Sequence, residues 1–209
     1  MEKQEIRTFG RRHGKKLSAR KESLVRDTLP ALCPRAGEKI DILEIGFGSG
    51  EHVRELSATN SDKIILGAEP FMNGVAALLS AICDESGAVL DEYKNIRIFP
   101  DDVRIVLNGG EYGFNEIWIL HPDPWPKARH EKRRLLNSDF LNLLSKNLSA
   151  NGKIIIGTDH WEYYDWILEQ VKNTNLCETD LPHSIIKTRY QKKNMAGTVE
   201  PKYIILTRP

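Results

Sequence analysis

The chain has 209 residues and a formal net charge of +1, and 40% of its residues are apolar. This composition argues against a disordered or fibrous chain, and the length suits one domain with a sizeable core. We find no signal peptide and no apolar run of membrane-spanning length, so we expect a cytoplasmic protein without a membrane partner.

Charge is distributed unevenly along the chain. Residues 1–21 carry eight Lys or Arg and two Glu, residues 187–208 carry six Lys or Arg and one Glu, and residues 38–116 carry 15 acids and six bases. Basic ends and an acidic middle suggest that the ends grip a polyanion while the middle holds a small cationic molecule. The three cysteines are widely spaced and fit no metal pattern, which predicts reduced thiols and no metal site.

The predicted elements alternate between strands and helices. Residues 1–22 lack an apolar period and are interpreted as a flexible basic arm that could contact phosphates, before a single domain at 23–209. A helix is expected from Lys21 to Leu32. Strands are then expected at 41–45, 63–68, 96–99, 116–120, 153–157, 184–186 and 202–207, with helices over 51–58, 73–84, 101–107, 139–148 and 161–171. Continuous apolar strands between helices predict a doubly wound α/β fold, with a mostly parallel sheet, helices on both faces and a reversed C-terminal strand.

A glycine-rich turn, Gly46-Phe47-Gly48-Ser49-Gly50, follows the first strand and is called the glycine turn below. Such turns let a ligand approach the backbone, although they also serve plain strand-to-helix packing. Glu51 stands where a dinucleotide-binding motif has its third glycine, and it would repel a pyrophosphate. The acids Glu44 and Glu51 instead suit a cofactor with an ammonium and a sulfonium group, S-adenosylmethionine.

Further acids close the next two strands. Glu69 lies 19 residues after Gly50, a spacing at which an acid commonly accepts hydrogen bonds from the ribose of an adenosine cofactor. The alternative is a solvated acid at a strand end. Of Asp101 and Asp102, one is expected to face the adenine amino group while the other caps the next helix. We expect Asp102 to be the cofactor residue.

The segment from His121 to Arg134 follows a buried strand. Pro122, Pro124 and Pro126 stop regular structure and fix a rigid turn, residues 121–126, called the proline turn below. It carries Asp123 and Trp125. The cations that follow are Lys127, Arg129, Lys132, Arg133 and Arg134. A carboxylate beside a flat ring and a cationic strip suits a nucleobase and its phosphates, whereas the alternative is an ordinary loop before a solvated basic helix.

Thr158-Asp159-His160 ends the fifth predicted strand, at the sheet edge where Asp123 is expected. Ligands in such folds bind outside the carboxyl ends of the strands, so both acids could face one substrate. Asp159 could alternatively cap the helix that begins near Trp161. His121 and His160 have no partner at metal-ligand spacing and are interpreted as structural.

Together, these motifs resemble the bacterial single-chain family of tRNA (guanine-N7)-methyltransferases. The resemblance covers residue 40 to the C-terminus, and the segment from Asp123 to Arg134 is its specific part, since the glycine turn is shared by methyltransferases generally. The matching residues are Leu43–Gly50, Gly67-Ala68-Glu69, Asp102, Pro122–His130 with Lys132-Arg133-Arg134, Thr158-Asp159 and Thr188-Arg189-Tyr190-Gln191.

The resemblance implies a Rossmann-like class I methyltransferase that uses S-adenosylmethionine to methylate a guanine, position 46, in the variable loop of tRNA. Asp123 would be the catalytic residue, and the enzyme would act as a monomer or homodimer without a metal. The cofactor residues would be Glu44, Gly46, Gly48, Glu69, Asp102 and Asp123. The substrate residues would be Lys127, Asp159, Thr188, Arg189, Tyr190 and Gln191. The family usually has Glu at the position of Gln191, which keeps an acceptor but lacks the charge.

Three other functions remain open from the residues alone. An amino-methyltransferase for adenine or cytosine would carry Asp or Asn followed by Pro-Pro and an aromatic residue, but here the order is Asp123-Pro124-Trp125-Pro126. Glu51 disfavours an oxidoreductase that uses NAD. A noncatalytic RNA-binding module would need the basic segments but not the series of acids.

Overall fold

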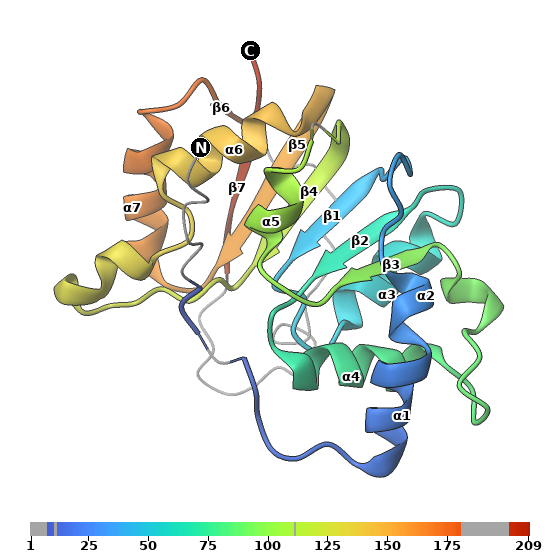
Figure 1. The fold of residues 1–209 in the computed structure, drawn as a ribbon. Helices are drawn as coiled ribbons and strands as arrows, with labels where there is room; N and C mark the ends of the chain where they lie inside the picture. Colours follow the sequence, from blue (N-terminus) through green and yellow to red (C-terminus); the bar gives the residue numbers. More distant parts are fainter. Residues whose placement is uncertain (1–7, 11, 111, 181–200) are drawn as a thin grey trace. The chain divides into compact units, whose positions relative to one another are not determined.

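The computed structural model describes residues 8–10, 12–110, 112–180 and 201–209 (Figure 1). Its strands form a mixed sheet in the order β3-β2-β1-β4-β5-β7-β6. Their bounds are β1 Ile42–Ile45, β2 Ile65–Ala68, β3 Ile96–Phe99, β4 Phe114–Leu120, β5 Leu148–Thr158, β6 Cys177–Thr179 and β7 Lys202–Thr207. β2 pairs with β3 and β4 with β5 in parallel, whereas β7 runs antiparallel to both β5 and β6. The prediction of a mostly parallel α/β sheet with a reversed last strand is confirmed.

Helices alternate with the strands as predicted. The α-helices are α1 Ala19–Asp27, α2 Leu29–Leu32, α3 Glu51–Thr59, α4 Met72–Ile82, α5 Val103–Leu107, α6 Ser138–Lys146 and α7 Trp161–Val171, and two 3₁₀ helices are η1 Asp91–Tyr93 and η2 Ala128–Arg133. The helix predicted from Lys21 to Leu32 instead begins at Ala19 and breaks at Thr28. Pro30 lies in the first turn of α2, where its missing N–H leaves no hydrogen bond unmade. The strand predicted at 184–186 lies outside the described residues.

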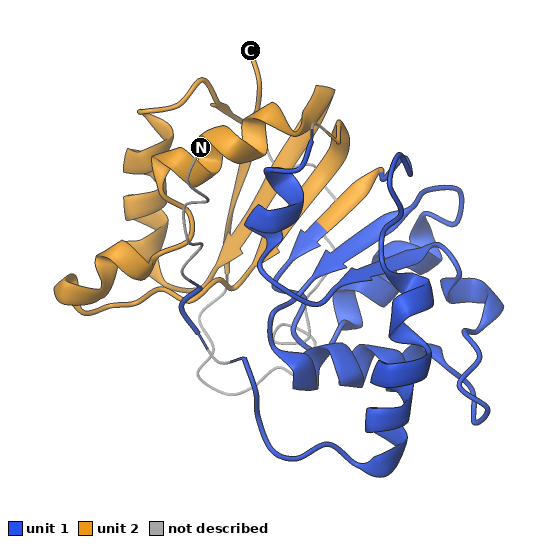
Figure 2. Cartoon of the chain, viewed as in Figure 1, with its two compact units in different colours: residues 1–40, 44–110 blue, residues 41–43, 111–209 orange. Residues whose placement is uncertain are grey.

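The chain forms two compact units (Figure 2). Unit 1 comprises residues 1–40 and 44–110, and unit 2 comprises residues 41–43 and 111–209. The two halves of β1 therefore belong to different units. The basic arm at 1–22 and the single domain at 23–209 stay predictions.

Unit 1 contains the end of β1, all of β2 and β3, and helices α1 to α5. β2 is completely buried, which explains its continuous apolar sequence. Most of α4 is buried, which explains why its sequence is largely apolar. It packs against α1. Its side chains Val75, Leu78, Leu79 and Ile82 are inaccessible to solvent.

Unit 2 is built around β5, which lies between β4 and β7 and contacts both α6 and α7. The side chains of Ile154 and Ile156 are fully buried in its centre. Because β4 and β5 are parallel, with Leu120 opposite Gly157, their carboxyl ends lie at one edge of the sheet. This register brings the residues that follow β4 next to those that follow β5.

Candidate active site

The glycine turn in unit 1 has an open backbone. Gly46 and Gly48 adopt positive φ angles of 74° and 58°, which side chains of L-residues rarely adopt. A Cβ atom placed on either glycine would meet no other atom within 4 Å. The turn therefore needs glycine for its conformation, and it leaves space beside the backbone for a ligand.

Glu69 holds the glycine turn from the end of β2. Its side chain is buried, with Oε2 accepting a hydrogen bond from the Gly48 N–H at 2.8 Å and Oε1 accepting one from the Phe71 N–H at 2.8 Å. Each carboxylate oxygen has more than one acceptor site, so these bonds leave capacity for hydroxyl groups of a ligand. Glu69 is thus a structural part of the turn as well as a candidate ligand residue.

Glu44 is also buried, in the middle of β1, and its Oε2 lies 3.0 Å from His52 Nδ1 in α3. A buried carboxylate needs such a partner because desolvation penalises its charge. The partner on α3 was not foreseen in the sequence, although the spacing of eight residues is short enough to join a strand to the helix that follows it.

Asp102 takes the role of the helix cap. As the N-cap of α5, its Oδ1 accepts hydrogen bonds from the Arg104 N–H at 3.0 Å and from Arg104 Nε at 2.8 Å, and its Oδ2 accepts one from Thr8 Oγ1 at 2.6 Å. Burial raises the pKa of Asp102, but the hydrogen bonds from Arg104 and Thr8 outweigh it, so the pKa is lowered overall. Asp101 is instead paired with Arg12, whose Nη2 lies 2.5 Å from Asp101 Oδ1. The cofactor role of Asp102 stays a prediction.

The described part of the N-terminal arm belongs to unit 1 and is hydrogen-bonded to the rest of that unit. Besides Thr8 and Arg12, the Gly14 N–H donates to Asn73 Oδ1 at 2.7 Å and Asn73 Nδ2 donates to the Lys15 carbonyl at 2.7 Å. These contacts place the arm along the start of α4 and beside the acids that follow β3. The sequence offered no signal for them because the residues have no local pattern.

The proline turn in unit 2 begins directly at the end of β4. The His121 N–H donates to the Gly157 carbonyl at 2.7 Å, which continues the pairing with β5. His121 and Trp125 have positive φ angles of 51° and 43°, a conformation that costs a residue other than glycine roughly 1–2 kcal/mol. Asp123 is exposed, and it makes no hydrogen bond or ion pair within the described residues. The turn is thus conformationally constrained while its acid remains available.

The aromatic and basic side chains around the proline turn contact each other. The ring of Trp125 packs edge-on against His130, with centroids 5.7 Å apart, and the Arg133 guanidinium lies 4.9 Å from its centroid. Lys127 is exposed at the start of η2, and its carbonyl accepts a hydrogen bond from the His130 N–H at 2.7 Å. The prediction of an aromatic ring beside a cationic strip corresponds to this arrangement, except that Arg134 is buried.

Asp159 lies at the end of β5, as predicted from the sequence. Its side chain is 51% exposed, and its Oδ1 is 3.8 Å from His121 Nδ1 at the start of the proline turn. His160, and not Asp159, caps α7: its Nδ1 accepts a hydrogen bond from the Tyr163 N–H at 3.3 Å. Asp159 is therefore available to a substrate, and the structural interpretation of His160 agrees with its cap. The predicted substrate residues Thr188, Arg189, Tyr190 and Gln191 lie outside the described residues.

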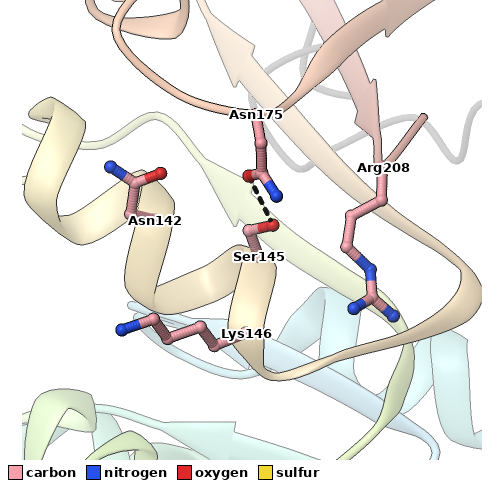
Figure 3. A pocket seen from close by; sticks show the side chains of 5 residues that line it. All are labelled: Asn142, Ser145, Lys146, Asn175 and Arg208. Carbon is pink, nitrogen blue, oxygen red and sulfur yellow. Dashed lines mark hydrogen bonds between the residues drawn. The ribbon is translucent and has the colours of Figure 1, made fainter.

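A surface pocket of about 310 Å³ lies elsewhere in unit 2, at the C-terminal end of α6 (Figure 3). Its walls are formed by Asn142, Ser145, Lys146, Asn175 and Arg208. Ser145 Oγ donates to Asn175 Oδ1 at 2.9 Å, as Figure 3 shows. Arg208 follows β7 next to the beginning of β5, so the pocket is at the opposite sheet edge from Asp159. Among the described residues, none of the predicted site residues lines it.

The residues of unit 1 fit a cofactor that carries positive charge and an adenosine. Glu44, just before the open glycine backbone, and Glu69, which is hydrogen-bonded to it, supply buried carboxylates. α3 begins with Glu51, which opposes a pyrophosphate. Within the described residues, no cluster of His, Cys, Asp or Glu is arranged to bind a metal ion. No helix among the described residues is long and apolar enough to cross a membrane.

Known proteins are similar to this chain over most of its length. The family described as "Putative methyltransferase" matches residues 38–203. A tRNA (guanine-N(7)-)-methyltransferase of Wolbachia pipientis wMel is 40% identical over 154 residues, covering 72% of this chain and 67% of that protein. A tRNA (guanine-N(7)-)-methyltransferase of Caulobacter vibrioides is 30% identical, covering 97% of this chain and 95% of that protein.

The chain belongs to the tRNA (guanine-N(7)-)-methyltransferase family. The family assignment from the proline turn and the glycine turn is thereby confirmed.

Solved structures agree with a methyltransferase fold. An antibiotic-related methyltransferase has a TM-score of 0.57 at 13% identity, covering 93% of this chain and 97% of its own. A precorrin-6y C5,15-methyltransferase from Geobacter metallireducens GS-15 has a TM-score of 0.55 at 15% identity, covering 94% of this chain and 92% of its own. At these identities the likeness shows the fold alone, which is the Rossmann-like fold of class I methyltransferases, as predicted.

Two features near the candidate site were missed by reasoning from the family motifs. Thr8 and Arg12 reach Asp102 and Asp101 from the arm, and Arg134 is buried beneath the proline turn. Nothing in the sequence separates Arg134 from the exposed cations beside it. Only the apolar residues Leu135 and Leu136 that follow indicate that the chain turns inward there.

Proposed function

We propose that this member of the family transfers the methyl group of S-adenosylmethionine to N7 of a guanine in the variable loop of tRNA, at position 46. The observation that supports the proposal most is the exposure of Asp123 on the proline turn. Asp123 is an exposed carboxylate without a hydrogen-bond or ion-pair partner among the described residues, on a constrained turn. An acid presented in this way is available to a substrate base.

The reaction places modest chemical demands on the protein. Bound S-adenosylmethionine supplies a methyl group activated by its positively charged sulfur. Guanine N7 carries a lone pair and no proton, so the attack requires neither a strong base nor a metal. As the N7–carbon bond forms, the bond between the methyl carbon and sulfur breaks. Its electron pair goes to the sulfur, which leaves as the neutral thioether of S-adenosylhomocysteine, and the positive charge passes to the base. The protein must therefore align the base and stabilise this charge.

Residues of unit 1 hold the cofactor in this proposal. Glu69 accepts hydrogen bonds from the ribose hydroxyls with the acceptor capacity that its backbone partners leave. Glu44 and the backbone of Gly46 and Gly48 surround the part of the cofactor that carries its positive charges, and Asp102 contacts the adenine side. The buried carboxylates and the open backbone of the glycine turn support this assignment.

Residues of unit 2 receive the guanine. Asp123 accepts hydrogen bonds from guanine N–H groups and stabilises the developing cation, and Asp159, at the end of the neighbouring strand, completes the acceptor set. Lys127, Arg129 and Arg133 bind phosphates next to the guanine, which must leave its stack to react. Thr188, Arg189, Tyr190 and Gln191 also bind tRNA in this proposal. We further propose that the enzyme acts in the cytoplasm as a monomer or homodimer.

The proposal is tested by incubating the pure protein with S-adenosylmethionine and unmodified tRNA, followed by mass spectrometry of the nucleosides. We expect 7-methylguanosine, with chemical cleavage at the modified base mapping it to the variable loop. Reactions without cofactor or without protein are the controls. Methylated adenine or cytosine would instead indicate an amino-methyltransferase. Tight binding of tRNA without any methylation would indicate a noncatalytic RNA-binding module.

A further inference from the structure

The proline turn has to hold an exposed acid in one position. Asp123 makes no hydrogen bond or ion pair in the described part of the chain, so it does not anchor the turn itself. The three prolines restrict the backbone, but His121 and Trp125 on either side adopt positive φ angles that are intrinsically unfavourable. Some neighbouring group must therefore stabilise this conformation.

Arg134 is positioned to provide that support. It is 4% exposed, and its Nε donates a hydrogen bond to the carbonyl of Pro124 at 2.9 Å. Pro124 directly follows Asp123, so this bond fixes the Pro124–Trp125 peptide, next to the acid. The contact spans ten residues of sequence and closes the segment into a loop.

The guanidinium of Arg134 is itself held by aromatic rings on α7. Its central carbon lies 5.0 Å from the ring centroid of Trp166 and 5.5 Å from that of Tyr163. The two rings are neighbours, with centroids 5.7 Å apart, and the guanidinium packs against both. Cation–π contacts of a desolvated arginine are favourable. On the fourth side, Arg134 Nη1 lies 3.7 Å from Glu131 Oε1.

Tyr163 stays neutral in this environment. Burial raises the pKa of Tyr163 to about 12, with the Arg134 charge lowering it and the Asp123 charge raising it. The Arg134 guanidinium therefore faces an uncharged ring. The Tyr163 hydroxyl also lies within 3.5 Å of the Leu136 N–H, which ties α7 to the chain just after Arg134.

We propose that Arg134 is a positioning residue for the reaction: it fixes the proline turn through the Pro124 carbonyl and thereby sets the position of Asp123. This inference rests on the proposed function. The proposal gives Arg134 a different role from the other cations of the strip. Its guanidinium is buried against Trp166, Tyr163 and the turn, so it is not exposed to tRNA phosphates. Arg133 is half-buried over Trp125, and Arg129 is exposed.

The test is the substitution Arg134→Lys, which keeps the charge but lacks the fork that can bond the carbonyl while contacting both rings. We expect the single-turnover rate with saturating cofactor and tRNA to fall about 10- to 100-fold, since a small displacement of a reacting group has costs of this size. The affinity for tRNA and its salt dependence should stay at the wild-type level, because no phosphate contact is lost.

Arg97→Lys is the matched control. Arg97 on β3 is likewise largely buried, pairs with Glu38 at 2.6 Å and donates to backbone carbonyls, but it belongs to unit 1. Its substitution should lower the melting temperature without changing the single-turnover rate. Equal rate losses in the two variants would mean that general destabilisation, and not positioning, explains the effect of Arg134→Lys.

The double variant with Asp123→Asn tests whether Arg134 acts through Asp123. If it does, Arg134→Lys should slow Asp123→Asn by less than about threefold, because the two losses are not additive. If Arg134→Lys does not fold, the single-turnover rate of Arg134→Ala is measured with and without added methylguanidinium. Recovery of the rate on addition supports the proposal. An unchanged rate in Arg134→Lys, fully additive losses, no recovery, or a flattened salt dependence would overturn it. Absence of methylation by the wild-type enzyme would instead refute the proposed function.

Discussion

The glycine turn and the proline turn both follow a buried strand, but the acids associated with them, Glu69 and Asp123, have different structural roles. Glu69 accepts hydrogen bonds from two backbone N–H groups and is part of the scaffold of the glycine turn. Asp123 has no such bond within the described residues, and its turn is supported by prolines and by Arg134. One acid is thus part of the scaffold of its turn, whereas the other is presented by a turn that relies on a separate anchor.

The substitution Asp123→Asn tests this difference with the largest expected effect. The single-turnover rate with saturating cofactor and tRNA should fall roughly 100- to 1,000-fold, the size of effect seen when a preorganised electrostatic contact is lost. The fold and most of the affinity for tRNA should remain, because Asp123 is exposed. Saturation removes binding defects from the comparison. A rate within a few-fold of wild type would remove Asp123 from the mechanism and make Asp159 the leading candidate.

The second test compares alanine substitutions of the two acids by urea unfolding. Glu69→Ala should lower the free energy of unfolding by about 1 kcal/mol for each of the two hydrogen bonds lost, those from the Gly48 and Phe71 N–H groups. Asp123→Ala should change it by less than about 0.5 kcal/mol, as surface substitutions usually do. Equal losses in the two variants would contradict the distinction between a structural and a presented acid.

A third prediction concerns the pH dependence of stability at Asp102. Its pKa is lowered in the folded state, so its contribution is fully present above the unfolded-state pKa of about 3.9 and is lost as the pH falls through the lower native pKa. Thermal unfolding between pH 7 and acid should therefore show a steeper acid loss in the wild type than in Asp102→Asn. Parallel curves would show that the bonds from Thr8 and Arg104 contribute little.

The smallest expected effect distinguishes two cations of the arm. Arg12 is paired with Asp101, whereas Lys16 is exposed and makes no hydrogen bond or ion pair in the part of the chain that the structure describes. If the arm binds tRNA phosphates, Lys16→Gln should reduce the slope of log affinity against log salt by about 0.7–0.9. Arg12→Gln should reduce it less. Unchanged slopes in both variants would show that the arm is merely solvated.

Much of the fold could be predicted because its signals are local. β3, α7 and β7 have the predicted bounds, since apolar runs and flanking polar residues mark their ends. β6 was missed because its residues are exposed and lack an apolar pattern, and it is defined by pairing with β7. β5 begins at Leu148, five residues earlier than predicted, because Asn151-Gly152 resembles a turn.

The candidate site could be predicted only in part. Glu69 was found because it directly follows a strand, and Asp123 because it lies in a recognisable motif just after one. The cap formed by His160 and the burial of Arg134 depend on contacts with α7, whose side chains are distant in the sequence or weakly patterned. Roles that arise from a three-dimensional neighbour, such as that of Thr8 at Asp102, leave no trace in a single sequence.

The most direct test of the central claim changes one atom of the substrate. A tRNA that carries 7-deazaguanosine at the variable-loop guanine has a C–H group in place of N7 and retains the other hydrogen-bonding groups of the base. We predict that the enzyme binds this tRNA as tightly as the unmodified one, within about twofold, but transfers no methyl group to it from S-adenosylmethionine. Methylation of the 7-deazaguanosine tRNA at the rate of the unmodified tRNA would contradict the account.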